Sequence, residues 1–123
     1  MKMTTQLIGA ALLGLLSTAA MAEQATTKTV AAVHTEFRQL SGQQVHLSGK
    51  VVKVNNGIMR RNFVHLEDGT GNADTKRLII TSTDTAKVGD EVEVVGSVKL
   101  DTDFGMGYFY PLLIENARIT LKK

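Results

Sequence analysis

The sequence contains no cysteine and no tryptophan, and it has a single proline. Without cysteine the chain has no thiol nucleophile, no Cys-ligated zinc or iron–sulfur cluster, no covalently attached c-type haem and no disulfide. Its 14 Lys and Arg against 12 Asp and Glu leave a net charge of +2, too small an excess to indicate a polyanionic partner. The P-loop, G-x-G-x-x-G and His-x-x-x-His motifs are also missing. The sequence therefore argues against an enzyme.

The first 22 residues are typical of a secretory signal. Lys2 supplies a positive start, residues 7–16 are apolar and uncharged, and Ala20-Met21-Ala22 places small residues where signal peptidase reads them. The apolar run is shorter than the roughly 20 residues that a membrane-spanning helix needs. We therefore expect cleavage after Ala22, no membrane anchor and a periplasmic location.

Residues 23–43 predict a polar leader and one short helix. Val30, Val33, Phe37 and Leu40 recur at spacings of three and four, which is the helical period, and Gly42 follows as a helix terminator. From residue 44 to residue 121 the apolar period is two, which predicts strands over 44–54, 61–67, 78–81, 91–100 and 108–121. Turns are expected at 55–57, 68–71, 87–90 and 101–107, and a bulge that bends the first strand at Gly49.

Five strands without a crossover helix predict an all-β fold. About 80 residues of this kind suit a five-stranded barrel of the OB-fold type better than a sandwich, which needs about seven strands. The alternation predicts a barrel core made of Val45, Leu47, Val52, Val64, Leu66, Ile79, Val92, Val94, Leu113 and Ile119.

Three segments carry a resemblance to a known family. Residues 42–52 (GQQVHLSGKVV), 63–71 (FVHLEDGTG) and 88–96 (VGDEVEVVG) resemble the first, second and fourth strands of OB-fold domains. More narrowly, residues 57–59 with 62–71, and residues 103–105 with 107–108, resemble small exported bacterial OB-fold proteins, some of which accompany respiratory nitrite reductase and other c-type cytochrome systems. That group often carries tryptophan where this chain has Phe63. The resemblance implies an OB fold and an accessory role beside a respiratory or metalloenzyme system.

OB-fold domains bind ligands on the outer side of the second and third strands, between the loop joining strands one and two and the loop joining strands four and five. If Val64 and Leu66 point into the core, Phe63 and His65 lie on that outer face. An alternative is that the aromatic residues of the last hairpin pack within it and Phe63 covers a barrel opening. The ligand-binding residues expected from this reasoning are Met59, Arg60, Arg61, Phe63, His65, Phe104 and Tyr108.

Three functions remain open. The first is a non-enzymatic periplasmic binding or accessory protein that recognises a protein partner or a small ligand through this aromatic face. The second is a copper(I) carrier with Met59, His65 and Met106 as ligands, because thioethers favour Cu(I); the methionines are otherwise ordinary loop residues. The third is single-stranded nucleic acid binding, with bases stacked on Phe63 and Tyr108, which export and the low net charge disfavour. No cofactor other than copper is implied.

Overall fold

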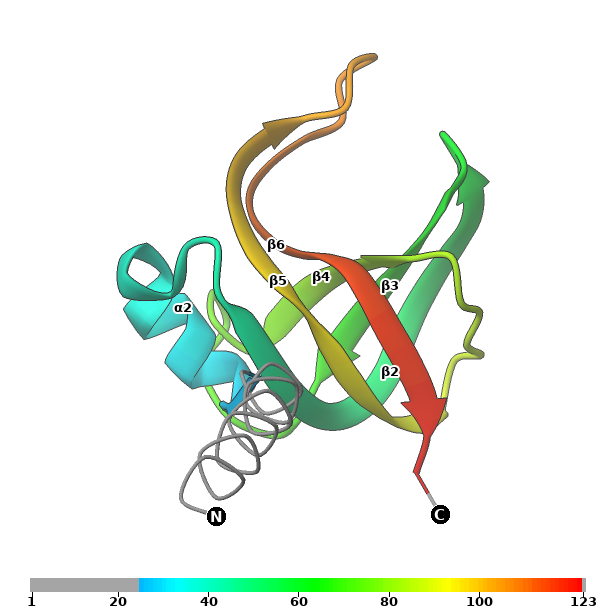
Figure 1. Ribbon diagram of the computed structural model, residues 1–123. Helices are drawn as coiled ribbons and strands as arrows, with labels where there is room; N and C mark the ends of the chain where they lie inside the picture. Colours follow the sequence, from blue (N-terminus) through cyan, green and yellow to red (C-terminus); the bar gives the residue numbers. More distant parts are fainter. Residues whose placement is uncertain (1–24, 123) are drawn as a thin grey trace, which may run out of the picture.

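Strands dominate the part of the chain that the computed structural model describes, residues 25–122, and one helix lies near its start (Figure 1). The predicted signal and its cleavage point fall outside these residues. The elements in chain order are β1 (Thr26–Thr27), α2 (Val30–Leu40), β2 (Gln44–Ile58), β3 (Arg61–Glu67), β4 (Arg77–Ser82), β5 (Glu91–Asp103) and β6 (Phe109–Leu121). The helix occupies the residues that the 3.6-residue periodicity predicts.

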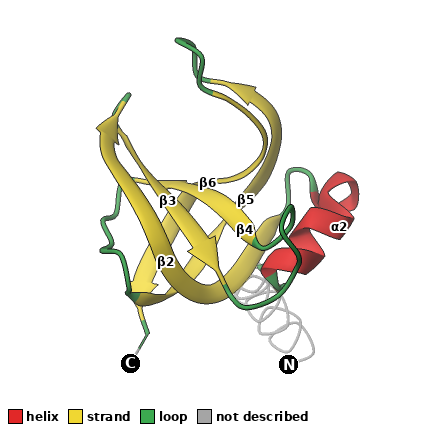
Figure 2. Ribbon diagram, turned by 180° about the vertical axis from the view of Figure 1, so that it is seen from behind, coloured by secondary structure: helices red, strands yellow, loops and turns green. Residues whose placement is uncertain are grey.

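Five of the strands form a cyclic sheet. The order of hydrogen-bonded neighbours is β1-β2-β3-β4-β6-β5, and β2 also pairs with β5, so the pairing closes on itself (Figure 2). The β4–β6 pair is parallel, and the other pairs of the cycle are antiparallel. The predicted all-β class is confirmed. The two-residue β1, which runs parallel to β2, was not predicted.

Strand β2 closes the cycle because it serves two partners. Its residues 44–50 pair with β5, and its residues from Lys50 onward pair with β3. Gly49 lies at this change of partner, where a Cβ atom would come within 2.6 Å of the carbonyl oxygen of Glu67. Only glycine allows this close approach. The bulge predicted at Gly49 is wrong, since the register irregularities of the β2–β3 pair lie between Val51 and Lys53 and between Asn55 and Ile58.

Two of the predicted core residues lie outside the core, and the displaced irregularity in β2 explains the first of them. Inward alternation continues unbroken to Val51, which is buried, and leaves Val52 half-buried. In β4 the inward residues are Leu78 and Ile80, so Ile79 faces the other way. The remaining core predictions are confirmed: Val45, Leu47, Val64, Leu66, Val92, Val94 and Leu113 are buried, and Ile119 packs partly buried against the core.

The turn between β2 and β3 lies later than predicted. Strand β2 continues through residues 55–57 to Ile58, and the chain reverses at Met59 and Arg60, whose φ angles are 51° and 65°. Two successive left-handed residues are typical of the tight turns that match the twist of a hairpin. The β2–β3 hairpin is consequently longer than predicted.

Candidate functional site

Two hairpins extend from the cyclic sheet at one end of the molecule. Strands β2 and β5 pair only through residues 44–50 and 91–97, and the tips of the β2–β3 and β5–β6 hairpins lie apart from each other at that end (Figure 1). The outward side chains of β3 and β4 are aligned in cross-strand pairs, Phe63 with Thr81 and His65 with Ile79. The predicted site residues lie on this face or on the two hairpins.

An aromatic cluster joins the two hairpins. The ring centroid of Phe63 lies 5.6 Å from those of Phe104 and Tyr110 and 6.2 Å from that of Tyr108. The Phe63–Phe104 pair is edge-to-face, an arrangement that aromatic quadrupoles favour. Phe63 is only 1% exposed. Phe63 lies on the face opposite the Val64 side chain, as predicted. The expectation that its ring is open to a ligand is wrong, because the β5–β6 hairpin covers it.

Arg61 connects this cluster to a buried acid. Its guanidinium lies 4.7 Å above the ring of Phe104, and its Nη2 atom is 3.6 Å from Oε1 of Glu115. The other carboxylate oxygen of Glu115 is 2.8 Å from Nζ of Lys99. Glu115 is buried, and two cations compensate its charge. The predicted ligand residue Arg61 is therefore engaged within the protein. The sequence analysis did not predict the buried Glu115, although an acidic residue directly after the apolar residues 112–114 could have indicated a buried charge.

His65 occupies the middle of the face as a half-buried residue. Burial, followed by the positive charges of Arg77 and Lys53, lowers its pKa, so the imidazole is neutral at pH 7. Its Nδ1 atom is buried without a hydrogen-bond partner in the described chain, as is Oγ1 of Thr81 on the same face.

The three residues proposed as copper ligands lie at three separate places. Met59 is in the β2–β3 turn, Met106 is in the β5–β6 turn, and His65 lies four residues along β3 from Arg61, about 13 Å at strand rise. The structure therefore does not gather them around one point. Within residues 25–122, no group of three or more His, Asp or Glu side chains could hold a metal ion either.

The β5–β6 turn is closely held by its own backbone. The N–H of Phe104 donates to the carbonyl of Tyr108 at 2.8 Å, and the N–H of Tyr108 donates to the carbonyl of Gly105 at 2.9 Å. Residues 105–107 all have left-handed φ angles, of 86°, 57° and 85°. Met106 is the non-glycine residue among them, and that backbone conformation costs about 1–2 kcal/mol for a residue with a Cβ atom.

This turn presents apolar side chains to solvent. Met106 is 91% exposed and Phe109 is 53% exposed, while Tyr108 beside them is also exposed. We call residues 104–109 the hairpin tip. Its inner rings pack on Phe63 and its outer side chains face solvent, so it forms an ordered apolar protrusion.

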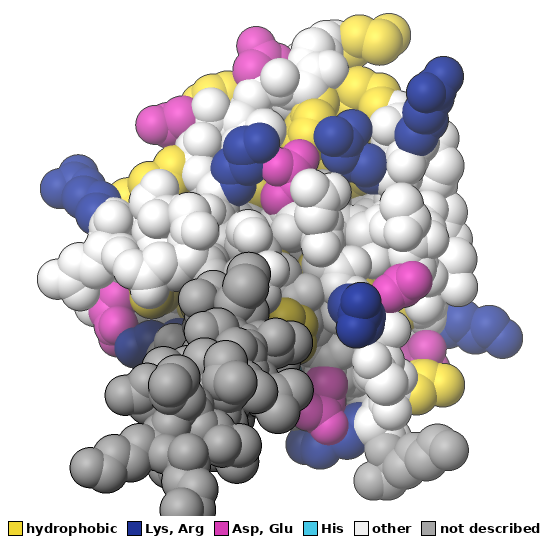
Figure 3. Space-filling model, viewed as in Figure 1, with side chains coloured by type: hydrophobic (Ala, Val, Ile, Leu, Met, Phe, Trp, Pro, Cys, Tyr) yellow, Lys and Arg dark blue, Asp and Glu magenta, His cyan; other side chains and the backbone are white. Residues whose placement is uncertain are grey.

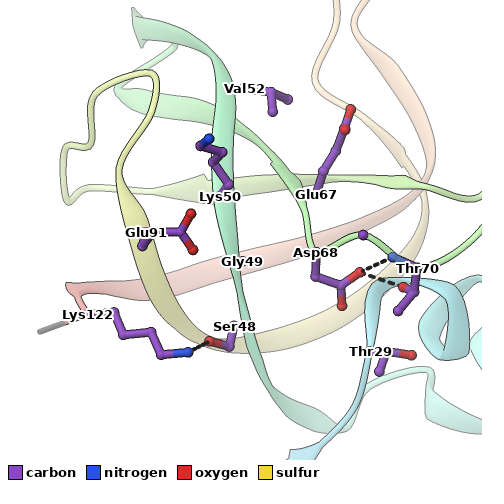
Figure 4. A pocket seen from close by; sticks show the side chains of 11 residues that line it. Thr29, Ser48, Gly49, Lys50, Val52, Glu67, Asp68, Thr70, Glu91 and Lys122 are labelled. Carbon is purple, nitrogen blue, oxygen red and sulfur yellow. Dashed lines mark hydrogen bonds between the residues drawn. The ribbon is translucent and has the colours of Figure 1, made fainter.

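A polar pocket of about 530 Å³ lies where the β3–β4 loop meets the start of α2 (Figure 4). Within it, Oδ2 of Asp68 accepts from the N–H of Val30 at 2.9 Å, and Oγ1 of Thr70 accepts from the N–H of Ala31 at 3.0 Å. Burial raises the pKa of Asp68, but hydrogen bonds from Thr70 and Val30 outweigh it, and the pKa lies below its ordinary value. The acid caps the helix from a distant loop, which is a structural role.

Charges of both signs are mixed over the surface. Figure 3 shows Lys and Arg side chains interspersed with Asp and Glu on the face in view, and hydrophobic side chains gathered towards the end that bears the hairpins. This pattern agrees with the net charge of +2. The visible face thus favours apolar contact at the tip over capture of a polyanion.

No protein-family model matches this chain, and no curated protein matches it. Among residues 25–122, no helix is both long enough and apolar enough to cross a membrane.

Proposed function

We propose that the protein is a non-enzymatic accessory protein of the periplasm that recognises a partner protein through the hairpin tip. One observation carries the proposal: Met106 and Phe109 are exposed on a turn whose other aromatic rings are anchored on buried Phe63. Exposed apolar patches on small proteins mark interaction sites, and the flexible thioether of methionine adapts to a partner surface. Holding the turn in place before binding reduces the entropy lost on association.

The scaffold that we propose is an OB-type barrel. A cyclic sheet of five strands, with two longer hairpins at one end, supports it, since the OB-fold is a five-stranded and partly open barrel. The signal-like residues 1–22 support export, and the resemblance to exported OB-fold proteins suggests a partner from a respiratory or metalloenzyme system.

Two alternatives are less well supported. Nucleic acid binding would use Phe63 for stacking and Arg61 for phosphate, but Phe63 is covered and Arg61 is engaged with Glu115 and Phe104. Copper binding would need Met59, His65 and Met106 at one point, and they lie apart. The hairpin tip needs no rearrangement to act.

The test is affinity capture from a periplasmic extract, which compares the wild type with variants of the hairpin tip and with a control variant at the far end of β6. Phe109 and Leu121 are the first and last residues of β6 and are 53% and 60% exposed. Phe109→Ser and Met106→Ser should each lose a partner that the wild type and Leu121→Ser retain. Equal capture by all four proteins, or no discrete partner, would refute the proposal.

A further inference from the structure

A second pocket lies beside the aromatic cluster and shares Tyr110 with it. It is a cleft of about 340 Å³ between α2, β4 and the start of β6, near the lower end of the range for small-molecule sites. Its lining is mostly apolar: Phe37, Leu78, Ile79, Tyr110, Pro111 and Leu112, with His34 and Arg77 as the polar members.

The apolar floor follows from the register of β4. Because Leu78 and Ile80 point into the core, Ile79 faces outward, where it forms part of the cleft. Tyr110 forms a wall shared with the aromatic cluster, since its ring lies 5.6 Å from that of Phe63. Phe37 contributes from α2. These side chains offer apolar surface to a ligand of one or two rings.

The guanidinium of Arg77 is the positively charged group in the lining of the cleft. Nε of Arg77 donates to Oε2 of Glu67 at 2.9 Å, and Nη2 lies 2.8 Å from the same oxygen in an ion pair, so this acid does not occupy all five guanidinium N–H groups. The side chain of Arg77 is 42% exposed and lines the cleft. Nε2 of His34 lies 2.6 Å from the backbone carbonyl of Arg77 and donates to it.

The charges around the cleft favour an anion. Arg38 of α2 lies over the Phe37 ring at 5.4 Å, and Lys53 of β2 is the register partner of His65 beside Ile79. Glu67 is the acid facing this region, and Arg77 pairs with it. After burial, the charges of Arg77 and Lys53 lower the pKa of His65, as a positive local potential requires.

We propose that this cleft binds a small organic anion, a carboxylate or sulfonate attached to a ring system or a branched apolar group. The anionic group accepts the free N–H donors of Arg77, and the apolar part lies on Ile79, Phe37 and Leu112. Arginine suits this role because its planar guanidinium binds two oxygens at once. Met106 and Phe109 do not line this cleft, so a test of anion binding is independent of a test of the partner-docking proposal.

The test uses two dyes with the same ring system, 8-anilinonaphthalene-1-sulfonate and its neutral counterpart N-phenyl-1-naphthylamine. Fluorescence titration of the wild type should show about tenfold tighter binding of the sulfonate, the effect of one charge-assisted contact. Arg77→Gln should abolish that preference and leave the affinity for the neutral dye within about twofold. Lys76→Gln, which changes the exposed neighbour outside the cleft, should retain the preference.

A second variant separates binding from stability. Glu67→Gln removes the acid that occupies Arg77, so the sulfonate should bind several-fold tighter; if the ion pair merely maintained the fold, both dyes would bind more weakly. Amide chemical-shift changes on adding the sulfonate should map to α2, β4 and the start of β6. Equal affinities for both dyes in the wild type, a preference that survives Arg77→Gln, or shifts confined to the hairpin tip would overturn the inference.

Discussion

The ring of Tyr110 lies 5.6 Å from the ring of Phe63, and the same tyrosine lines the cleft beside α2. Burial, and then the neighbouring Tyr108, raise the pKa of Tyr110, so its hydroxyl stays neutral at physiological pH. One side chain therefore links the packing of the β5–β6 hairpin to the shape of the cleft.

Phe63→Ala should destabilise the fold by about 3–5 kcal/mol, as much as Leu66→Ala or more. The reason is that Phe63 is buried among three aromatic rings although it lies outside the main core. Urea unfolding followed by circular dichroism measures the difference. Phe109→Ala, which truncates an exposed ring, should stay within about 0.5 kcal/mol. A loss below about 1 kcal/mol for Phe63→Ala would mean that the hairpin does not cover it in solution.

Gly49→Ala should cost about 1–3 kcal/mol, because the added methyl group would clash with the carbonyl oxygen of Glu67 and push β2 away from β3. Thermal unfolding measures this cost, with the neighbouring Ser48→Ala as the control. An unchanged melting temperature for Gly49→Ala would contradict the close crossing of these strands.

Asp68→Ala should lower stability by about 1–2 kcal/mol at pH 7, because α2 loses a cap. The pKa of Asp68 is lower in the folded than in the unfolded protein, so its contribution is fully present above the unfolded value near 4 and is lost as the pH falls through the folded value. The difference in the free energy of unfolding between the wild type and Asp68→Ala should therefore decrease as the pH falls below about 4. A difference that is constant from pH 7 to pH 3 would show that the charge of Asp68 has no part in the cap.

Local patterns in the sequence were enough to predict the helix and most of the core. Val30, Val33 and Leu40 share one helix face whatever surrounds them, and the alternation about Val64 and Leu66 holds along a single strand. The inward and outward alternation after Gly49 was predicted wrongly because the position of the irregularity, between Val51 and Lys53, depends on how β2 pairs with β3, which the local sequence pattern does not show.

The candidate site depends on contacts between residues far apart in the chain. Phe63 occupies the predicted face, yet its burial is decided by Phe104 and Tyr110, which lie more than 40 positions later. Glu115 and Arg61 are likewise brought together only by the closing of the sheet. The alternation of apolar residues predicts which face of the sheet a side chain lies on, but it does not predict which residues from distant parts of the chain cover that side chain.

The most direct measurement of the docking role is site-specific photo-cross-linking in living cells that produce the protein. A photoreactive phenylalanine analogue is placed at positions 106 and 109 of the hairpin tip and, as controls of comparable exposure, at positions 88 and 121. The account predicts one discrete protein adduct from both tip positions and none from the controls. The same adducts from all four positions, or no adduct from the tip, would contradict it.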